Sequence, residues 1–262
     1  MRDLLNDLSE GLSHPDPIRR AQIQMKKALP KKFYSAVTVA GSMEEEFRIE
    51  LDGKPIRTPA RQLLKVPSSL LADLIAFEWR EQGEEIDPSS MPVTRLVNTA
   101  IDGVANDRQA VLEDIIRFST SDLLCYRADG PEALVERQRE RWDPVLDWAA
   151  SEFGARFILI EGVIHHNQPA EAISAFASRL ARYDDAFQLA ALHTMTTLTG
   201  SALLALAFAG GFISMQDVWN LAHLDEDWTI EQWGSDEEAE KRRAWRFAEF
   251  KAAADVFQTI SR

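Results

Sequence analysis

Apolar and charged residues alternate along Glu46–Asp52. A period of two is typical of a strand with one buried face, so this stretch is predicted to be a strand. Phe33–Ala40 is predicted as a strand before it, and Asp52-Gly53 as the turn of a hairpin, because both residues tolerate a positive φ. Pro55 and two later prolines exclude a helix from the segment that follows. This part of the chain is therefore expected to be mainly β.

From Ser68 onward, apolar residues recur every three or four positions, which is typical of helices that bury one face. The first of these helices is expected to be capped by Ser68 or Ser69 and to stop at Gly83. Pro144 is expected to break a later helix, with Asp143 capping a second helix after the break. Further helices are predicted to begin at or beside Asp107, Pro131, Pro169, Asp185, Ser214 and Ser235. Between them, Arg156–Glu161 is predicted as one isolated strand or an extended connection.

The order of these elements predicts an α+β fold. It comprises a polar leader over residues 1–32, a β-rich N-terminal domain over 33–85 and a helical C-terminal domain over 86–262. The stretch Ala186–Gln216 carries no charged side chain and is long enough to cross a bilayer. Its unbroken apolar part, Gly200–Ile213, has only the length expected of a buried helix. We therefore expect a core helix there and no stable membrane insertion.

The charge balance narrows the choice of partner. With 42 acidic and 29 basic side chains the formal charge is −13, which disfavours nucleic acid and favours basic or apolar partners. One cysteine excludes an internal disulfide and points to a reducing compartment. The first thirty residues interleave acids and bases, so they form neither an apolar signal core nor an acid-free transit peptide. The expected location is the cytoplasm.

The chain lacks the common signatures of catalysis. It has no GxxxxGK[ST], GxGxxG or GxSxG motif, and none of its five histidines has a ligand spacing such as HExxH. Adjacent His165 and His166 would point in opposite directions in an extended chain and are expected in a surface loop. His193 is expected to be a hydrogen-bonded core residue, and Cys125 a small core residue. No cofactor or metal is expected.

The segment Asp225–Glu240 combines eight acidic residues and two tryptophans with no basic residue. A capping box formed by Ser235 and Glu238, together with the helix dipole, accounts for the later acids. Three adjacent anions at Asp225–Asp227 repel one another, which makes a basic partner attractive, and the indoles nearby would serve as anchors. Two of these carboxylates could instead act as an acid/base pair or a cation site. The candidate partner-binding residues are Asp225, Glu226, Asp227, Trp228, Trp233, Glu237 and Glu238.

Several blocks, in order, resemble one known family. They are FRIELDGKPIRTP (Phe47–Pro59), EWREQGEEIDPSSMPVTRLVNTAID (Glu78–Asp102), STSDLLCYRA, WDPVLDW, HTMTTLTGSALLALA and LDEDWTIEQWG. This arrangement is similar to the assembly chaperones of the F-type ATP synthase that protect the α subunit of its catalytic head. The resemblance covers roughly Phe33–Lys251, and the missing transit peptide indicates the bacterial branch.

The resemblance implies a non-enzyme with a β-rich N-terminal domain and a helical C-terminal domain. It implies that the chain binds the free α subunit on the surface that the β subunit later covers, and is released on assembly. An acidic residue important for this role falls in Asp225–Asp227, and we favour Glu226. Trp79 is expected in the core, and Asn98 and Thr99 in a turn or loop. The alternatives are a metal-dependent hydrolase that uses the same three acids and an acidic mimic of nucleic acid.

Overall fold

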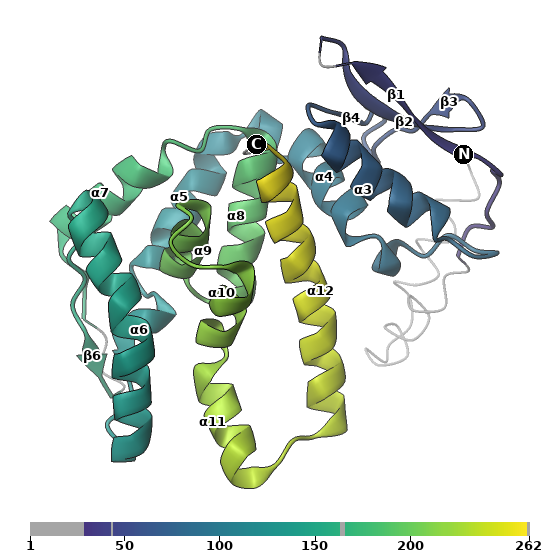
Figure 1. Cartoon of the computed structure of the whole chain (residues 1–262). Helices are drawn as coiled ribbons and strands as arrows, with labels where there is room; N and C mark the ends of the chain where they lie inside the picture. The colour runs from purple at the N-terminus through teal and green to yellow at the C-terminus, as the bar shows by residue number, and fades with distance from the viewer. Residues whose placement is uncertain (1–28, 43, 163–165, 261–262) are drawn as a thin grey trace, which may run out of the picture.

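The computed structural model describes residues 29–42, 44–162 and 166–260. Most of the predicted leader, and His165, lie outside this range. The fold is α+β, as predicted, with a small antiparallel sheet at one end and a helical body filling the rest (Figure 1). The sheet strands are β1 (Val37–Ser42), β2 (Glu46–Leu51), β3 (Lys54–Pro55) and β4 (Lys65–Val66). Strand β2 is central, since it pairs with the other three.

The hairpin turn lies where the alternation predicted it. Leu51 pairs with Lys54, which leaves Asp52 (φ 48°) and Gly53 (φ 76°) as a two-residue turn. Two positive φ values suit the twist of the paired strands, and the Asp-Gly pair tolerates them. The strand before it begins only at Val37, later than predicted, and the chain leading up to it runs beside the segment that follows the first helix.

Helix α3 (Ser69–Arg80) covers the sheet and is capped by Ser68, whose hydroxyl accepts a hydrogen bond from Leu71. The helix ends at Arg80, with Glu81 as its C-cap residue, shortly before the stop predicted at Gly83. Beyond it, η1 (Pro88–Ser90) leads into α4 (Pro92–Asp102). Asn98 and Thr99 therefore lie within a helix, and their predicted place in a turn or loop was wrong. Trp79 packs against the core, as expected, with its ring partly exposed.

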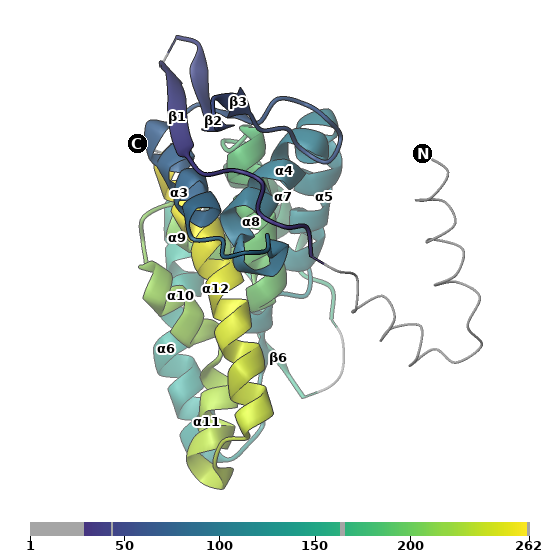
Figure 2. The same ribbon diagram turned by 90° about the vertical axis from the view of Figure 1, so that its right-hand side faces the viewer.

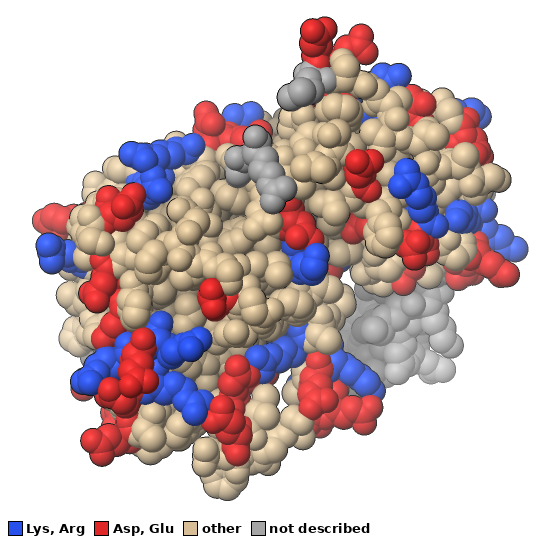
Figure 3. Space-filling view, in the orientation of Figure 1, with Lys and Arg blue, Asp and Glu red and all other residues tan. Residues whose placement is uncertain are grey.

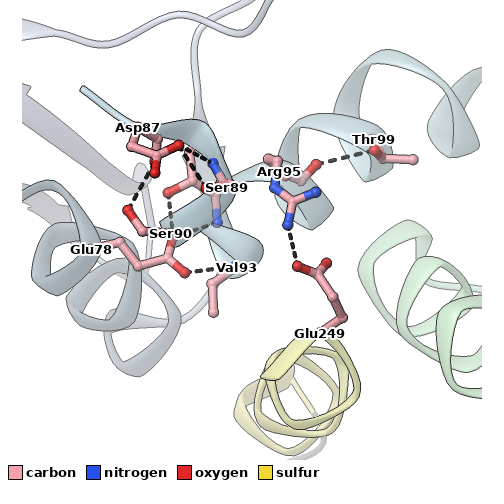
Figure 4. A network of polar contacts seen from close by, with 9 residues as sticks. Glu78, Asp87, Ser89, Ser90, Val93, Arg95, Thr99 and Glu249 are labelled. Carbon is pink, nitrogen blue, oxygen red and sulfur yellow. Dashed lines mark hydrogen bonds and ion pairs between the residues drawn. The ribbon is translucent and has the colours of Figure 1, made fainter. Parts of the chain in front are cut away.

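The carboxylate of Glu78 joins these two helices (Figure 4). It accepts hydrogen bonds from Val93 N (2.7 Å), Thr94 N (2.7 Å) and Thr94 Oγ1 (2.6 Å). These groups lie at the start of α4, whose own N-cap residue, Met91, supplies no side-chain hydrogen bond. Burial raises the pKa of Glu78, and the hydrogen bonds from Thr94 and Val93 oppose that rise. A residue of one helix thus caps the next and fixes their relative position.

The helical body is built around α8 (Ala186–Thr199), and α12 (Glu237–Ile260) runs along it (Figure 2). Two short strands, β5 (Tyr126–Arg127) and β6 (Ile160–Glu161), pair in parallel, so the predicted isolated strand has a partner. Cys125 is buried as expected, and burial raises the pKa of its thiol. The other elements of the body are η2 (Val104–Asn106), α5 (Arg108–Ser119), η3 (Leu123–Cys125), α6 (Glu132–Phe153), α7 (Ala170–Leu180), α9 (Ala202–Ala209), α10 (Met215–Ala222) and α11 (Leu224–Trp233).

Helix α6 runs through Pro144 without a break, so the predicted division into two helices was wrong. Proline removes one backbone hydrogen bond from a helix. Trp142 and Val145, on either side of Pro144, are both buried, and we attribute the continuity to the packing of this face. Asp143 does not cap a second helix; its carboxylate lies 2.7 Å from the Arg127 guanidinium.

The charge-free stretch forms two helices. Gly200 ends α8 in the left-handed conformation (φ 70°), and Ser201 caps α9. Every residue of α9 from Ala202 to Phe208 is buried, as expected of a core helix. No helix in the described part of the chain is both long and apolar enough to cross a membrane.

Asp122 holds the start of α9 in place and is fully buried. Its carboxylate accepts hydrogen bonds from Ser201 Oγ (2.7 Å), Leu203 N (2.9 Å) and Leu124 N (3.1 Å). Burial raises the pKa of Asp122 to about 6, against the opposing effect of these bonds. One side chain therefore joins η3 to α9 across 80 residues of sequence.

Candidate functional site

The candidate residues lie at the end of the helical body farthest from the sheet, where α11 turns into α12 (Figure 1). Asp225, Glu226 and Asp227 form the first turn of α11, a helix that the sequence pattern did not predict. The partial positive charge of a helix N-terminus stabilises anions there. This position offsets the mutual repulsion on which the sequence argument relied.

The three carboxylates point to different neighbours. Asp225 accepts a hydrogen bond from Gln138 Nε2 on α6 (2.8 Å), and Asp227 pairs with Arg243 on α12. Glu226 has no Lys or Arg at ion-pair distance in the described part of the chain. Its side chain is 41% exposed and lies 3.9 Å from His223 Nε2. Of the three, Glu226 is the carboxylate left for a partner.

The later acids serve α12 itself. Asp236 accepts a hydrogen bond from Ala239 N (3.0 Å), so it caps the helix, and the predicted Ser235–Glu238 capping box was wrong. Glu237 and Glu238 pair with Lys241 and Arg242 one turn later, on an exposed face. Exposed pairs of this spacing contribute only about 0.3–0.5 kcal/mol each. They are weaker candidates for partner binding than Glu226.

A groove of about 500 Å³ runs between α11 and α12. Its acidic lining residues are Glu226, Asp227, Asp236 and Glu240, and its apolar ones include Ile230 and Ala239. The only base among them, Arg243, is engaged with Asp227. The groove therefore suits a basic side chain whose aliphatic stem packs on apolar surface. Sequence reasoning missed Ile230 and Asp236 as groove residues, because their spacing gives no sign that two helices turn back on each other.

The two tryptophans of α11 differ in environment. Trp228 lies under the Arg137 guanidinium, 4.8 Å from the ring centre, and Arg137 also binds Glu231 through two 2.9 Å contacts. Trp233, at the end of α11, is 85% exposed. Basic and acidic side chains are interleaved around this end of the molecule (Figure 3). Trp233 is thus the indole available as an anchor, whereas Trp228 is held within the fold.

No enzyme site emerges among the described residues. No group of three His, Cys, Asp or Glu side chains within the described ranges is placed to hold a metal ion. His193 is only partly buried, and its Nε2 lies 2.8 Å from Asp114 Oδ2, so it is hydrogen-bonded as expected. His166 is exposed, whereas its neighbour His165 lies outside the described residues.

Comparison with known proteins identifies the family. Residues 31–150 match the ATP12 chaperone protein family. The fold superposes on the crystal structure of Atp12 from Paracoccus denitrificans with a TM-score of 0.80 and 39% identity, over 88% of this chain and 98% of that one. The chain belongs to the ATP12 chaperone family. Its members are chaperones of F1 ATP synthase assembly, not enzymes, and the resemblance found in the sequence is confirmed.

Two further relatives of this ATP12 chain, one bacterial and one mitochondrial, show which branch of the family it resembles more. The crystal structure of the Atu1473 protein from Agrobacterium tumefaciens has a TM-score of 0.86 and 65% identity, and the match covers 99% of this chain and 97% of that one. Protein atp12, mitochondrial, from Schizosaccharomyces pombe is 27% identical over 206 residues, which is 74% of this chain and 70% of that protein. The bacterial relatives are the more similar of these, in keeping with the predicted bacterial branch.

Lowering the pH is expected to destabilise the start of α11. His223, beside Glu226, is buried, and its Nδ1 donates to the Trp219 carbonyl (2.8 Å). Burial lowers the pKa of His223 below its ordinary value, so the unfolded chain binds the proton more tightly. Stability is therefore lost as the pH falls below about 6.5. Urea unfolding between pH 5 and 8 should show a steeper loss for the wild type than for His223→Gln; parallel profiles would contradict this.

Proposed function

We propose that this ATP12-family chaperone binds the free α subunit of the F-type ATP synthase, shields its subunit interface from aggregation and leaves when the β subunit takes that place. The observation that carries the proposal is Glu226, a half-exposed carboxylate without a Lys or Arg partner among the described residues, in the groove between α11 and α12. The proposed location is the cytoplasm, where a single buried cysteine stays reduced.

The physical argument starts from the client. An isolated subunit of an obligate ring exposes large, partly apolar interfaces, which aggregate unless they are covered. The acidic groove attracts basic segments, and exposed Trp233 beside it offers apolar contact area. Charge raises the rate of encounter, and a small contact of this kind can exchange for the permanent partner. No observation favours the metal-dependent hydrolase or the nucleic-acid mimic.

The direct test is to express the α subunit of the same organism's ATP synthase alone and together with this chain. The α subunit should stay in solution and co-purify only when the chain is present. If the α subunit aggregates to the same extent with and without the chain, or does not co-purify with it, the α subunit is not the client. The β subunit, expressed in the same way, is the matched control for the choice of subunit.

Glu226→Lys is expected to leave the chain folded and to weaken α-subunit binding at least about tenfold, or 1.4 kcal/mol, because it places a cation where we expect the client's base. Titration with purified α subunit measures the change. Glu152→Lys is the control, since it reverses one exposed acid on α6, away from the groove. Equal binding by the two variants would remove Glu226 from the contact.

A further inference from the structure

Helix α11 carries the candidate site but adds little to the hydrophobic core. Of its ten residues only Leu224 is buried. Neither Trp228 nor Ile230 is among the apolar side chains that pack on the core. Burial of an apolar face normally supplies most of the stability of a helix in a protein. The position of α11 therefore depends on polar contacts with its neighbours.

The helix lies between α6 and α12 and turns a different side to each (Figure 1). The residues that contact α6 are Asp225, Trp228 and Glu231. The residues that line the groove shared with α12 are Glu226, Asp227 and Ile230. Spacings of three and four residues place each set on one side of a helix. A contact on the α6 side therefore sets where the groove side points.

Arg137 of α6 contacts α11 at two residues. Its two terminal nitrogens each lie 2.9 Å from a different carboxylate oxygen of Glu231. The same guanidinium lies over the ring of Trp228, 4.8 Å from its centre. A planar guanidinium that pairs through two contacts and also stacks on an indole fixes the orientation of both partners, which a point charge does not.

The other two cross-helix contacts, at Asp225 and Asp227, hold only the first turn of α11. Beyond that turn, the described structure shows no hydrogen bond or ion pair from α11 to another element except those of Arg137. Without Arg137, the last two turns would have no polar tie to the body of the protein. These turns carry Ile230 of the groove and the exposed Trp233.

We infer that Arg137 is a positioning residue of the groove: it holds α11 against α6 and thereby fixes where Glu226 and Trp233 meet a client. Arg137 does not line the groove, so it acts through α11. Its role in client binding rests on the proposed function, whereas its hold on α11 is a property of the free chain. Two separate measurements therefore apply.

Hydrogen exchange of the free, full-length chain, followed by mass spectrometry, tests the hold on α11. Arg137→Ala should raise the exchange rate of amides 228–233 about tenfold, while α8 in the core keeps its rate. Arg139→Ala is the matched control, since Arg139 lies on the same helix but pairs with Glu136, within α6. Equal exchange of α11 in the wild type and Arg137→Ala would overturn the inference.

Exchanging the two charges separates the ion pair from a general loss of packing. Arg137→Glu alone and Glu231→Arg alone place like charges opposite each other, so each should raise exchange in α11 at least as much as Arg137→Ala. The double variant restores an ion pair between the same positions and should bring the rate back toward that of the wild type. A double variant with the same rate as the single ones would also overturn the inference, because the pair would then not be what holds α11.

Titration with purified α subunit tests the consequence for the client. Arg137→Ala should weaken binding about fivefold, because a loosened α11 presents the groove correctly for less of the time. The same change makes the chain more acidic, which by itself would favour a basic client. Arg139→Ala alters the net charge equally and should bind like the wild type.

The two measurements also separate the possible failures. Faster exchange of α11 in Arg137→Ala with unchanged client binding would overturn the role of Arg137 in presenting the groove. Failure of the wild type itself to bind the α subunit contradicts the proposed function, and exchange alone then decides whether Arg137 holds α11.

Discussion

Asp122→Ala is expected to lower the free energy of unfolding by about 3–5 kcal/mol, the largest effect of a single polar substitution that we predict. The change removes the acceptor of three hydrogen bonds, from Ser201 Oγ, Leu203 N and Leu124 N, at a site with no exposure to solvent. Each donor left unsatisfied in a buried site costs about 1–3 kcal/mol, and the cavity adds to the cost. Urea unfolding followed by circular dichroism measures the difference.

Asp107→Ala is the matched control for this substitution. Asp107 is exposed and caps α5 by accepting one hydrogen bond from Ala110 N (3.1 Å). Its loss should cost only about 1 kcal/mol, since water replaces the acceptor. Equal losses for the two variants would show that the buried bonds of Asp122 are worth no more than an ordinary exposed cap.

Glu78→Ala is expected to cost about 3–4 kcal/mol of unfolding free energy. Glu78 is 8% exposed, and its carboxylate is the only side-chain cap of α4 in the described structure. Without it, the amide groups of Val93 and Thr94 lose their acceptor inside the fold, and α3 loses its polar connection to α4. The measurement is again urea unfolding, compared with the wild type at pH 7.

Glu81→Ala controls for the loss of a glutamate from the same helix. Glu81 is exposed at the end of α3, so its replacement should change stability by no more than about 0.5 kcal/mol. Glu78→Gln separates shape from charge, because the amide keeps one acceptor but turns a donor toward donors. It should fall between wild type and Glu78→Ala; a Gln variant as stable as wild type would mean that the ionised carboxylate is not required.

Local patterns predicted the parts of the fold that depend on near neighbours in the chain. The alternation before Asp52-Gly53 predicted the hairpin, and Asp107 was correctly expected at the start of a helix. In both cases the deciding contacts join residues within a few positions of one another. The assignment to a chaperone family also came from the sequence, through ordered blocks whose similarity the comparisons confirmed.

Long-range packing decided where those patterns failed. Pro144 normally ends a helix, yet the buried face of α6 continues through it. The apolar run after His193 concealed the division at Gly200, which Asp122 reinforces from 80 residues away. Neither result is visible in a short window of sequence, because the stabilising contacts come from distant elements.

For the candidate site, too, the sequence determined some features and the tertiary structure decided others. The sequence determined that acids and tryptophans are concentrated in residues 225–240, that the chain is strongly acidic, and that a β-rich region precedes a helical one. Only the tertiary structure decided which of the acids are free. Gln138 engages Asp225 and Arg243 engages Asp227, whereas Glu226 is left facing a groove. Composition sets how much charge a segment carries, but the availability of each charge depends on which distant donors folding brings beside it.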